Sequence, residues 1–156
     1  VEEVMDHSQH EMIEIIDINS DKRVNEMPAS WDGEADVTLT LGTKPGLKFD
    51  KSKLQVKAGS KIKLVFNNDD DMLHNLVIVK PNSVDKVGQS AQNMGLNGAE
   101  LGYIPDLPEV LFHTGLMEPE STEAIYFTAP QEKGDYTFVC TFPGHYTLMQ
   151  GTLRVK

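Results

Sequence analysis

Cysteine is nearly absent from this chain, and so are long apolar segments. The 156 residues include a single cysteine, Cys140, so no disulfide can form within the chain. Because free thiols occur in proteins of many compartments, the cysteine count alone leaves the compartment open. No apolar run approaches the roughly 18 residues that a transmembrane helix needs. We therefore expect neither a membrane span nor a disulfide-stabilised scaffold.

Basic residues are also scarce. The 14 lysines and arginines stand against 24 aspartates and glutamates, which gives a formal net charge of −10. Nucleic acid is disfavoured as a partner, because phosphate binding needs clusters of basic side chains. The negative field would steer a basic protein partner toward this chain, or it serves solubility alone. The composition supports these two interpretations equally.

Short segments of alternating polar and apolar residues predict an all-β domain over residues 35–156, and the chain length favours a single domain. The segment 73–79 is almost entirely apolar, as in a strand buried on both faces. The expected strands are 36–41, 53–57, 61–66, 73–79, 110–112, 122–128, 135–140 and 149–155. About eight short strands separated by turn residues favour a Greek-key β-sandwich. Residues 82–108 interrupt this rhythm, and we expect a helical flap there with a short helix over 84–93.

Residues 1–34 differ from the rest of the chain. They are rich in acidic residues and contain the only tryptophan, Trp31. We interpret them as an N-terminal acidic extension or a linker between domains, docked onto the main domain. The chain begins at Val1 and shows no signal peptide, so we expect a processed mature form or an excised domain.

A second group of potential copper ligands lies within this extension. It consists of Met5, His7, His10 and Met12. Thioether and imidazole groups so close together would suit Cu(I) or Cu(II). The competing interpretation, which the acidic composition favours, is a disordered terminus without a metal.

Three potential metal ligands lie close together near the C-terminus with the spacing C-x4-H-x3-M. They are Cys140, His145 and Met149, and His74 adds a second imidazole from the apolar segment far upstream. In a Greek-key sandwich the ends of these strands meet at one pole. A thiolate and two imidazoles with a weak axial thioether form the ligand set of a blue-copper electron-transfer site, so we expect one type 1 copper ion as the cofactor.

The loop that carries these ligands is built to be stiff. Pro143 fixes its own φ angle and restricts Phe142, and Gly144 permits a turn that a side chain would block. The alternative is a buried thiol beside an unrelated surface histidine, because a single C-x4-H match is weak. The following methionine and the second histidine favour the copper site.

These motifs resemble the cupredoxin family, specifically azurin and the auracyanins. The resemblance covers about residues 35–156 and rests on Cys-Thr-Phe-Pro-Gly-His at 140–145, Leu-Met-Gln-Gly-Thr-Leu at 148–153 and Met-Leu-His-Asn at 72–75. It implies a cupredoxin-like sandwich and a one-electron carrier, not an enzyme, that is periplasmic or otherwise exported. Its implied partners are redox proteins such as a c-type cytochrome or an oxidoreductase.

The resemblance also implies roles for individual residues. His74, Cys140 and His145 would be equatorial ligands and Met149 the axial one, while Asn75 would tie the ligand loops together. The apolar docking surface around His145 would consist of Met72, Phe142, Pro143, Thr147 and Leu148. The alternative for these five residues is ordinary loop packing.

The chain departs from azurin at two positions beside His74. Leu73 stands where azurin has a glycine whose carbonyl lies opposite the methionine. The sequence therefore leaves open whether a backbone carbonyl makes a fifth contact to the metal. Leu76 replaces a buried tryptophan. Azurin's disulfide is also impossible here.

Two other functions stay open beside electron transfer. One is a copper-handling protein for storage or delivery, and the other is the detached cupredoxin domain of a larger redox enzyme. The sequence contains no recognisable nucleophile-base pair or phosphate-binding loop. We interpret His113 as a core or surface histidine and Asp69–Asp71 as a solvated turn.

Overall fold

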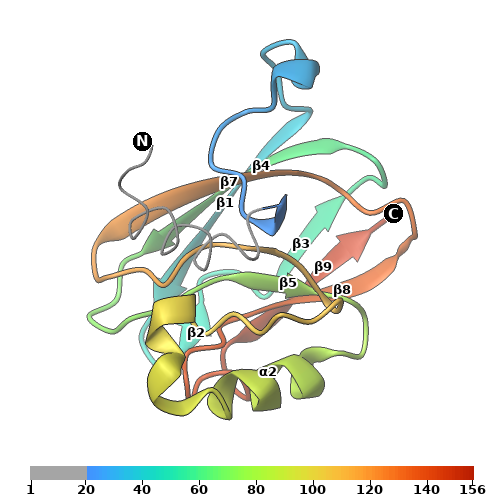
Figure 1. The fold of residues 1–156 in the computed structure, drawn as a ribbon. Coiled ribbons are helices and arrows are strands. Elements are labelled where there is room, and N and C mark those ends of the chain that lie inside the picture. The colour runs from blue at the N-terminus through green and yellow to red at the C-terminus, as the bar shows by residue number, and fades with distance from the viewer. Residues whose placement is uncertain (1–20) are drawn as a thin grey trace, which may run out of the picture.

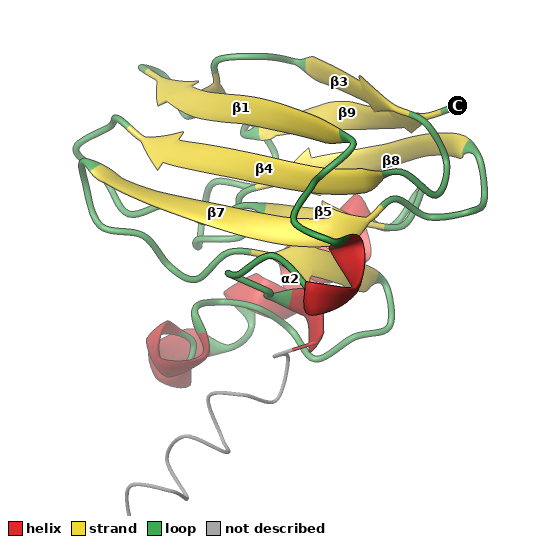
Figure 2. Cartoon of the chain, turned by 90° about the horizontal axis from the view of Figure 1, so that it is seen from above, coloured by secondary structure: helices red, strands yellow, loops and turns green. Residues whose placement is uncertain are grey.

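The computed structural model describes residues 21–156, which form two β-sheets packed face to face (Figure 1). Within these residues, a four-stranded sheet has the order β2-β1-β4-β7 and a five-stranded sheet the order β3-β9-β8-β5-β6. The first contains β1 (Val37–Lys44), β2 (Lys48–Phe49), β4 (Lys61–Asn68) and β7 (Ser121–Thr128). The second contains β3 (Lys53–Val56), β5 (Val77–Val79), β6 (Val110–His113), β8 (Gly134–Val139) and β9 (Gln150–Val155). The two layers are visible from above in Figure 2, where β1, β4 and β7 lie in front of β3, β9, β8 and β5.

The predicted all-β sandwich is confirmed, with two open sheets of mixed pairing. Strand β1 runs parallel to β4, and β3 runs parallel to β9, while the other pairs are antiparallel. The described residues form nine strands instead of about eight, because the two-residue strand β2 is too short to give a periodic pattern. None of the helices within residues 21–156 is long and apolar enough to cross a membrane.

The core lies between the sheets, and its residues follow from the alternation of polar and apolar side chains along the strands. In β4 every second residue is buried, which places Ile62, Leu64 and Phe66 inside. The Phe49 ring lies between Phe66 and Phe138, with centroid distances of 5.7 and 5.2 Å in edge-to-face geometry. Such burial of aromatic and aliphatic surface is the main favourable term in folding.

Strand β5 is buried on both faces, as its apolar sequence predicts. Ile78 faces the core between the sheets, whereas Val77 and Val79 belong to a second apolar cluster with Val87 of helix α2 (Val84–Gln92). The strand is shorter than predicted. Residues before Val77 are loop, and His74 makes only an isolated β-bridge with Met117.

The predicted helix within residues 82–108 is confirmed as α2, and two short 3-10 helices follow it, η3 (Gly95–Asn97) and η4 (Ala99–Leu101). Helix α2 covers the outer face of the five-stranded sheet (Figure 1). It also touches the loop between β8 and β9. The Gln89 side chain donates to the Tyr146 hydroxyl at 2.8 Å, and the Gly144 amide donates to Gln92 Oε1 at 3.2 Å.

Gly88 is the closest point of this helix to the loop. A Cβ atom there would lie 2.3 Å from the Tyr146 ring. Gly→Ala in a helix normally stabilises by up to about 1 kcal/mol. We expect the opposite sign for Gly88→Ala, a loss of about 1–3 kcal/mol from overpacking, measured by urea unfolding of the metal-free protein. The control is Ser90→Ala on the same helix, which should be neutral or stabilising. A stabilised Gly88→Ala variant would contradict the close packing of Tyr146 on α2.

Residues 21–34 dock along β7. The Tyr126 amide donates to the Val24 carbonyl at 2.9 Å, and Arg23 pairs with Glu123 at 2.8 Å. The 3-10 helix η2 (Ala29–Trp31) carries Trp31, which is 6% exposed and packs edge-on against the Tyr126 ring. This part of the predicted extension therefore contacts the sheet. The predicted domain boundary at residue 35 stays a prediction.

Candidate metal centre

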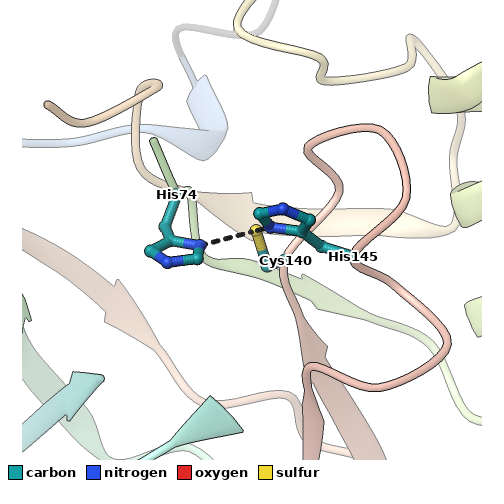
Figure 3. A group of neighbouring side chains, drawn as sticks. All are labelled: His74, Cys140 and His145. Carbon is teal, nitrogen blue, oxygen red and sulfur yellow. Dashed lines mark hydrogen bonds between the residues drawn. The ribbon is translucent and has the colours of Figure 1, made fainter. Parts of the chain in front are cut away.

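Three potential ligand atoms meet beneath the surface at one end of the sandwich (Figure 3). The Cys140 sulfur lies 3.6 Å from His74 Nδ1 and 3.7 Å from His145 Nδ1. All three residues are buried, and their ligand atoms lie within 4.8 Å of one another. His74 and Cys140 are 66 residues apart in sequence, so the tertiary fold alone brings them together.

Backbone hydrogen bonds fix His74 and Cys140 in place. His74 exchanges two backbone hydrogen bonds with Met117, at 3.2 and 2.8 Å. Cys140 directly follows β8, and its amide donates to the Met149 carbonyl at 3.0 Å, which extends the β8–β9 pairing by one residue pair.

The loop from Cys140 to Met149 closes tightly on itself. The His145 amide donates to the Phe142 carbonyl at 3.0 Å, and the Met149 amide donates to the His145 carbonyl at 2.8 Å. Gly144 has a φ of 87°, a conformation that favours glycine, so the predicted tight turn is present. Met149 is completely buried beside Cys140 and His145.

The protonation chemistry of this cluster fits a soft metal cation. Burial raises the pKa of the Cys140 thiol to about 11, and it lowers the pKa of His145, with His74 contributing further. The His145 imidazole is therefore neutral near pH 7, with a lone pair available for a metal. The buried thiol is protonated unless a cation stabilises the thiolate, and a metal ligated by a thiolate supplies that charge.

Asn75 connects the segment after His74 to the segment after Cys140. Its Oδ1 accepts from the Thr141 amide at 2.8 Å, and its Nδ2 donates to Thr141 Oγ1 at 2.8 Å and to the Gly102 carbonyl at 2.9 Å. Thr141 Oγ1 in turn donates to the Tyr103 carbonyl at 2.7 Å. The network therefore joins both ligand segments to the end of the flap.

The two leucines that flank His74 and Asn75 differ in burial. Leu73 is half-buried, and Leu76 is completely buried in the core between the sheets, at the position where the resemblance places a tryptophan.

The residues expected in a docking surface differ in exposure. Met72 and Leu148 are 39% and 64% exposed, which is unusual for large apolar side chains. Thr147 is exposed, while Phe142 and Pro143 are half-buried. The Phe142 ring lies 5.0 Å from the His145 ring between centroids, and 5.3 Å from the Tyr103 ring.

Asp70 is a site residue that sequence reasoning missed. Its Oδ2 lies 2.8 Å from His74 Nε2, so the description of Asp69–Asp71 as a solvated turn is wrong for Asp70 and right for its two exposed neighbours. The hydrogen bond to His74 holds the pKa of Asp70 below its usual value. The signal in the sequence was the four-residue spacing of Asp70 and His74, which is weak by itself.

His113 does not join the cluster. His113 is buried at the end of β6, with its Nδ1 2.7 Å from the Thr114 carbonyl, as expected for a core histidine. The possible second copper site at Met5, His7, His10 and Met12 lies outside residues 21–156, which the structure describes.

Comparison with known proteins identifies the family of this fold and site. Residues 35–156 match the model of copper binding proteins of the plastocyanin/azurin family. The chain belongs to this family of blue copper proteins, and its cluster of two histidines, a cysteine and a methionine fits a single type 1 copper site.

The relatives include auracyanins and azurins. The chain is 37% identical to auracyanin-A of Chloroflexus aurantiacus over 128 residues, which cover 80% of this chain and 77% of auracyanin-A. It is 35% identical to azurin of Pseudomonas aeruginosa over 88 residues, which cover 54% of this chain and 57% of that azurin. The solved structure of auracyanin A, described as a blue copper protein, matches with a TM-score of 0.70 at 36% identity, covering 77% of this chain and 98% of that one.

Proposed function

We propose that this protein is a one-electron carrier in which His74, Cys140 and His145 would be the strong ligands of one copper ion and Met149 its weak ligand. The observation that carries the proposal is the buried Cys140 sulfur flanked by two imidazole Nδ1 atoms at 3.6 and 3.7 Å. When bound, copper supplies a couple between Cu(I) and Cu(II). Type 1 sites with this ligand set serve electron transfer.

The protein's own contribution is a rigid, dry ligand set. His74, Cys140 and Met149 are completely buried, so bulk water is excluded from three of the four side chains. The backbone hydrogen bonds at His74 and Met149 and the Asn75 network fix the backbone that carries these side chains, and none of these bonds involves a metal. A pocket whose shape does not depend on the oxidation state suits fast electron transfer. With all four side chains engaged, no position would stay free for a substrate, so we propose that the protein is not an enzyme.

The visible and EPR spectra of the copper-loaded protein test this function. We expect an intense visible band from thiolate-to-Cu(II) charge transfer in the oxidised protein and the EPR signal of one mononuclear type 1 centre. Zinc-loaded protein is the matched control, because Zn²⁺ occupies thiolate and imidazole sites without redox chemistry. A sample that contains one equivalent of Cu(II) but lacks a strong visible band would rule out the proposed site.

The Met149→Leu variant tests whether Met149 would be a weak ligand of the copper. Leucine has a similar volume and no donor sulfur, so the variant should keep copper and its visible band. Its reduction potential should rise, because a donor that stabilises Cu(II) is lost. The measurement is a redox titration against the unaltered protein. A lower potential in the variant would refute the proposed role of Met149 as a weak ligand.

Electrons would pass through the edge of His145, which is 6% exposed. Met72, two residues before His74, and Leu148, three residues after His145, are large apolar side chains that are exposed. We propose that these two residues, with Phe142, Pro143 and Thr147, contact a redox protein such as a c-type cytochrome or an oxidoreductase. The net charge of −10 would speed encounter with a partner whose surface is basic. We also propose a periplasmic or otherwise exported location, supported by a relative named outer membrane protein H.8 from Neisseria gonorrhoeae, 38% identical over 86 residues.

A further inference from the structure

We propose that Asp70 is a positioning residue for the metal ligand His74, and that its carboxylate lowers the reduction potential of the site by fixing the His74 tautomer and stabilising Cu(II). The proposal rests on the function proposed above. Its structural basis is the 2.8 Å contact between Asp70 Oδ2 and His74 Nε2, on the side of the imidazole ring opposite the Cys140 sulfur.

Asp70 is held in place by Asn68, the completely buried last residue of β4. The Asn68 side-chain amide lies 2.9 Å from the Met72 carbonyl and 3.1 Å from the Met117 carbonyl, and its Oδ1 accepts from the Asp70 amide at 3.1 Å. Met117 is also the residue that bridges His74 through the backbone. Asn68 therefore fixes Asp70 and His74 relative to each other.

Both oxygens of the Asp70 carboxylate have a hydrogen-bond partner. Oδ1 accepts from the Asp71 amide at 2.8 Å, which leaves Oδ2 directed at His74 Nε2. The Asp70 side chain is only 14% exposed and that of His74 is not exposed at all, so water competes weakly for this contact. Hydrogen bonds to an ionised acceptor are about twice as strong as neutral ones.

This contact decides which nitrogen of His74 carries the proton. An ionised carboxylate accepts hydrogen bonds only, so the proton of the neutral imidazole resides on Nε2. Nδ1 then presents its lone pair toward Cys140. A carboxylate behind a ligand histidine fixes the ring and increases the basicity of the metal-bound nitrogen. A more basic ligand and a nearby negative charge both favour Cu(II) over Cu(I), which lowers the potential.

The test compares Asp70→Asn with Asp71→Asn at pH 7. Both variants remove one negative charge from the same turn, but Asp71 is exposed and contributes only its backbone amide to the Asp70 contact. We expect Asp70→Asn to shift the ratio of Cu(I) to Cu(II) affinity about tenfold toward Cu(I), which is about 59 mV upward for one electron. Asp71→Asn should give less than a third of this shift. Equal shifts in the two variants would mean that charge alone acts, and the positioning role would be wrong.

A second measurement needs no copper. Nitrogen-15 NMR of the metal-free protein should show His74 as the Nε2–H tautomer, and Asp70→Ala should convert it to a mixture of tautomers. Cu(II) affinity of Asp70→Ala should fall about 10–100-fold, the usual cost of losing such a partner. An unchanged tautomer in a folded Asp70→Ala protein would overturn the proposal. Should that variant not fold, the tautomer of the unaltered protein and the near-isosteric Asp70→Asn decide the question.

The copper measurements and the NMR measurement together distinguish a failure of this proposal from a failure of the proposed function. Failure of the unaltered protein to give a blue copper spectrum would refute electron transfer, while the tautomer of His74 would still show whether Asp70 orients it. A blue spectrum with no difference between the Asp70 and Asp71 variants would refute only the role of Asp70.

Discussion

Replacing Cys140 with serine should give a protein without the intense visible band, even at saturating copper. The band requires a thiolate bonded to Cu(II), and Cys140 is the only cysteine in the chain, so no other residue can replace it. Serine is nearly isosteric but binds as a neutral alcohol, which is a poor ligand for either oxidation state. We expect copper affinity to fall by more than the roughly 10–100-fold that follows loss of an outer hydrogen-bond partner.

The measurement is visible absorption beside the copper content of the dialysed protein. Met149→Leu is the matched control, because it alters a ligand in the same loop and keeps the thiolate. The circular dichroism of the metal-free Cys140→Ser protein checks that the fold is unchanged. A Cys140→Ser variant that keeps an intense blue colour would show that the metal binds somewhere other than the cluster in Figure 3.

Asn75→Leu should give the largest loss of stability among the variants discussed. Leucine has the same branched shape but is larger and has no polar atoms, so it leaves the Thr141 amide and the Gly102 carbonyl without the partners described above. A buried polar group without a partner costs about 1–3 kcal/mol, so two give about 2–6 kcal/mol. Because a domain of this size shifts by about 2–4 °C per kcal/mol, the midpoint of thermal unfolding should fall by roughly 4–24 °C.

Thermal unfolding of the metal-free protein measures this effect without any contribution from copper. The control is Asn97→Leu, which makes the same chemical change at an exposed position in η3 and should shift the midpoint little. Equal shifts for the two variants would mean that the Asn75 network does not stabilise the fold. Copper binding by Asn75→Leu should also weaken, because the segments after His74 and Cys140 lose their connection.

The sequence predicted the cluster of candidate ligands better than its surroundings. Cys140, His145 and Met149 lie within ten residues, so their spacing alone carries information, and a stiff loop with a glycine turn keeps them together. His74 could be added because it adjoins an apolar strand whose position in a sandwich is predictable. The long strands were predictable for a similar reason, since burial in β4 alternates at every residue.

Features that depend on tertiary contacts escaped prediction. An Asp-rich turn is normally solvated. The contact of Asp70 with His74 depends on the hydrogen bond between Asn68 and the Asp70 amide, which the sequence does not show. The strand β2 has two residues, too few for a period. Gly88 could be recognised as a packing site only once Tyr146 was known to lie against α2.

The docked segment 21–34 also shields the protein from unwanted β-pairing. An exposed edge strand offers free amides and carbonyls to a neighbouring molecule and is a common starting point for aggregation. In the described part of the chain, β7 is one edge of the four-stranded sheet, and its Tyr126 amide donates to the Val24 carbonyl. An electron carrier of the proposed kind must meet its partners briefly and separate again, and the docked segment leaves less open backbone on β7 to which a second copy could pair.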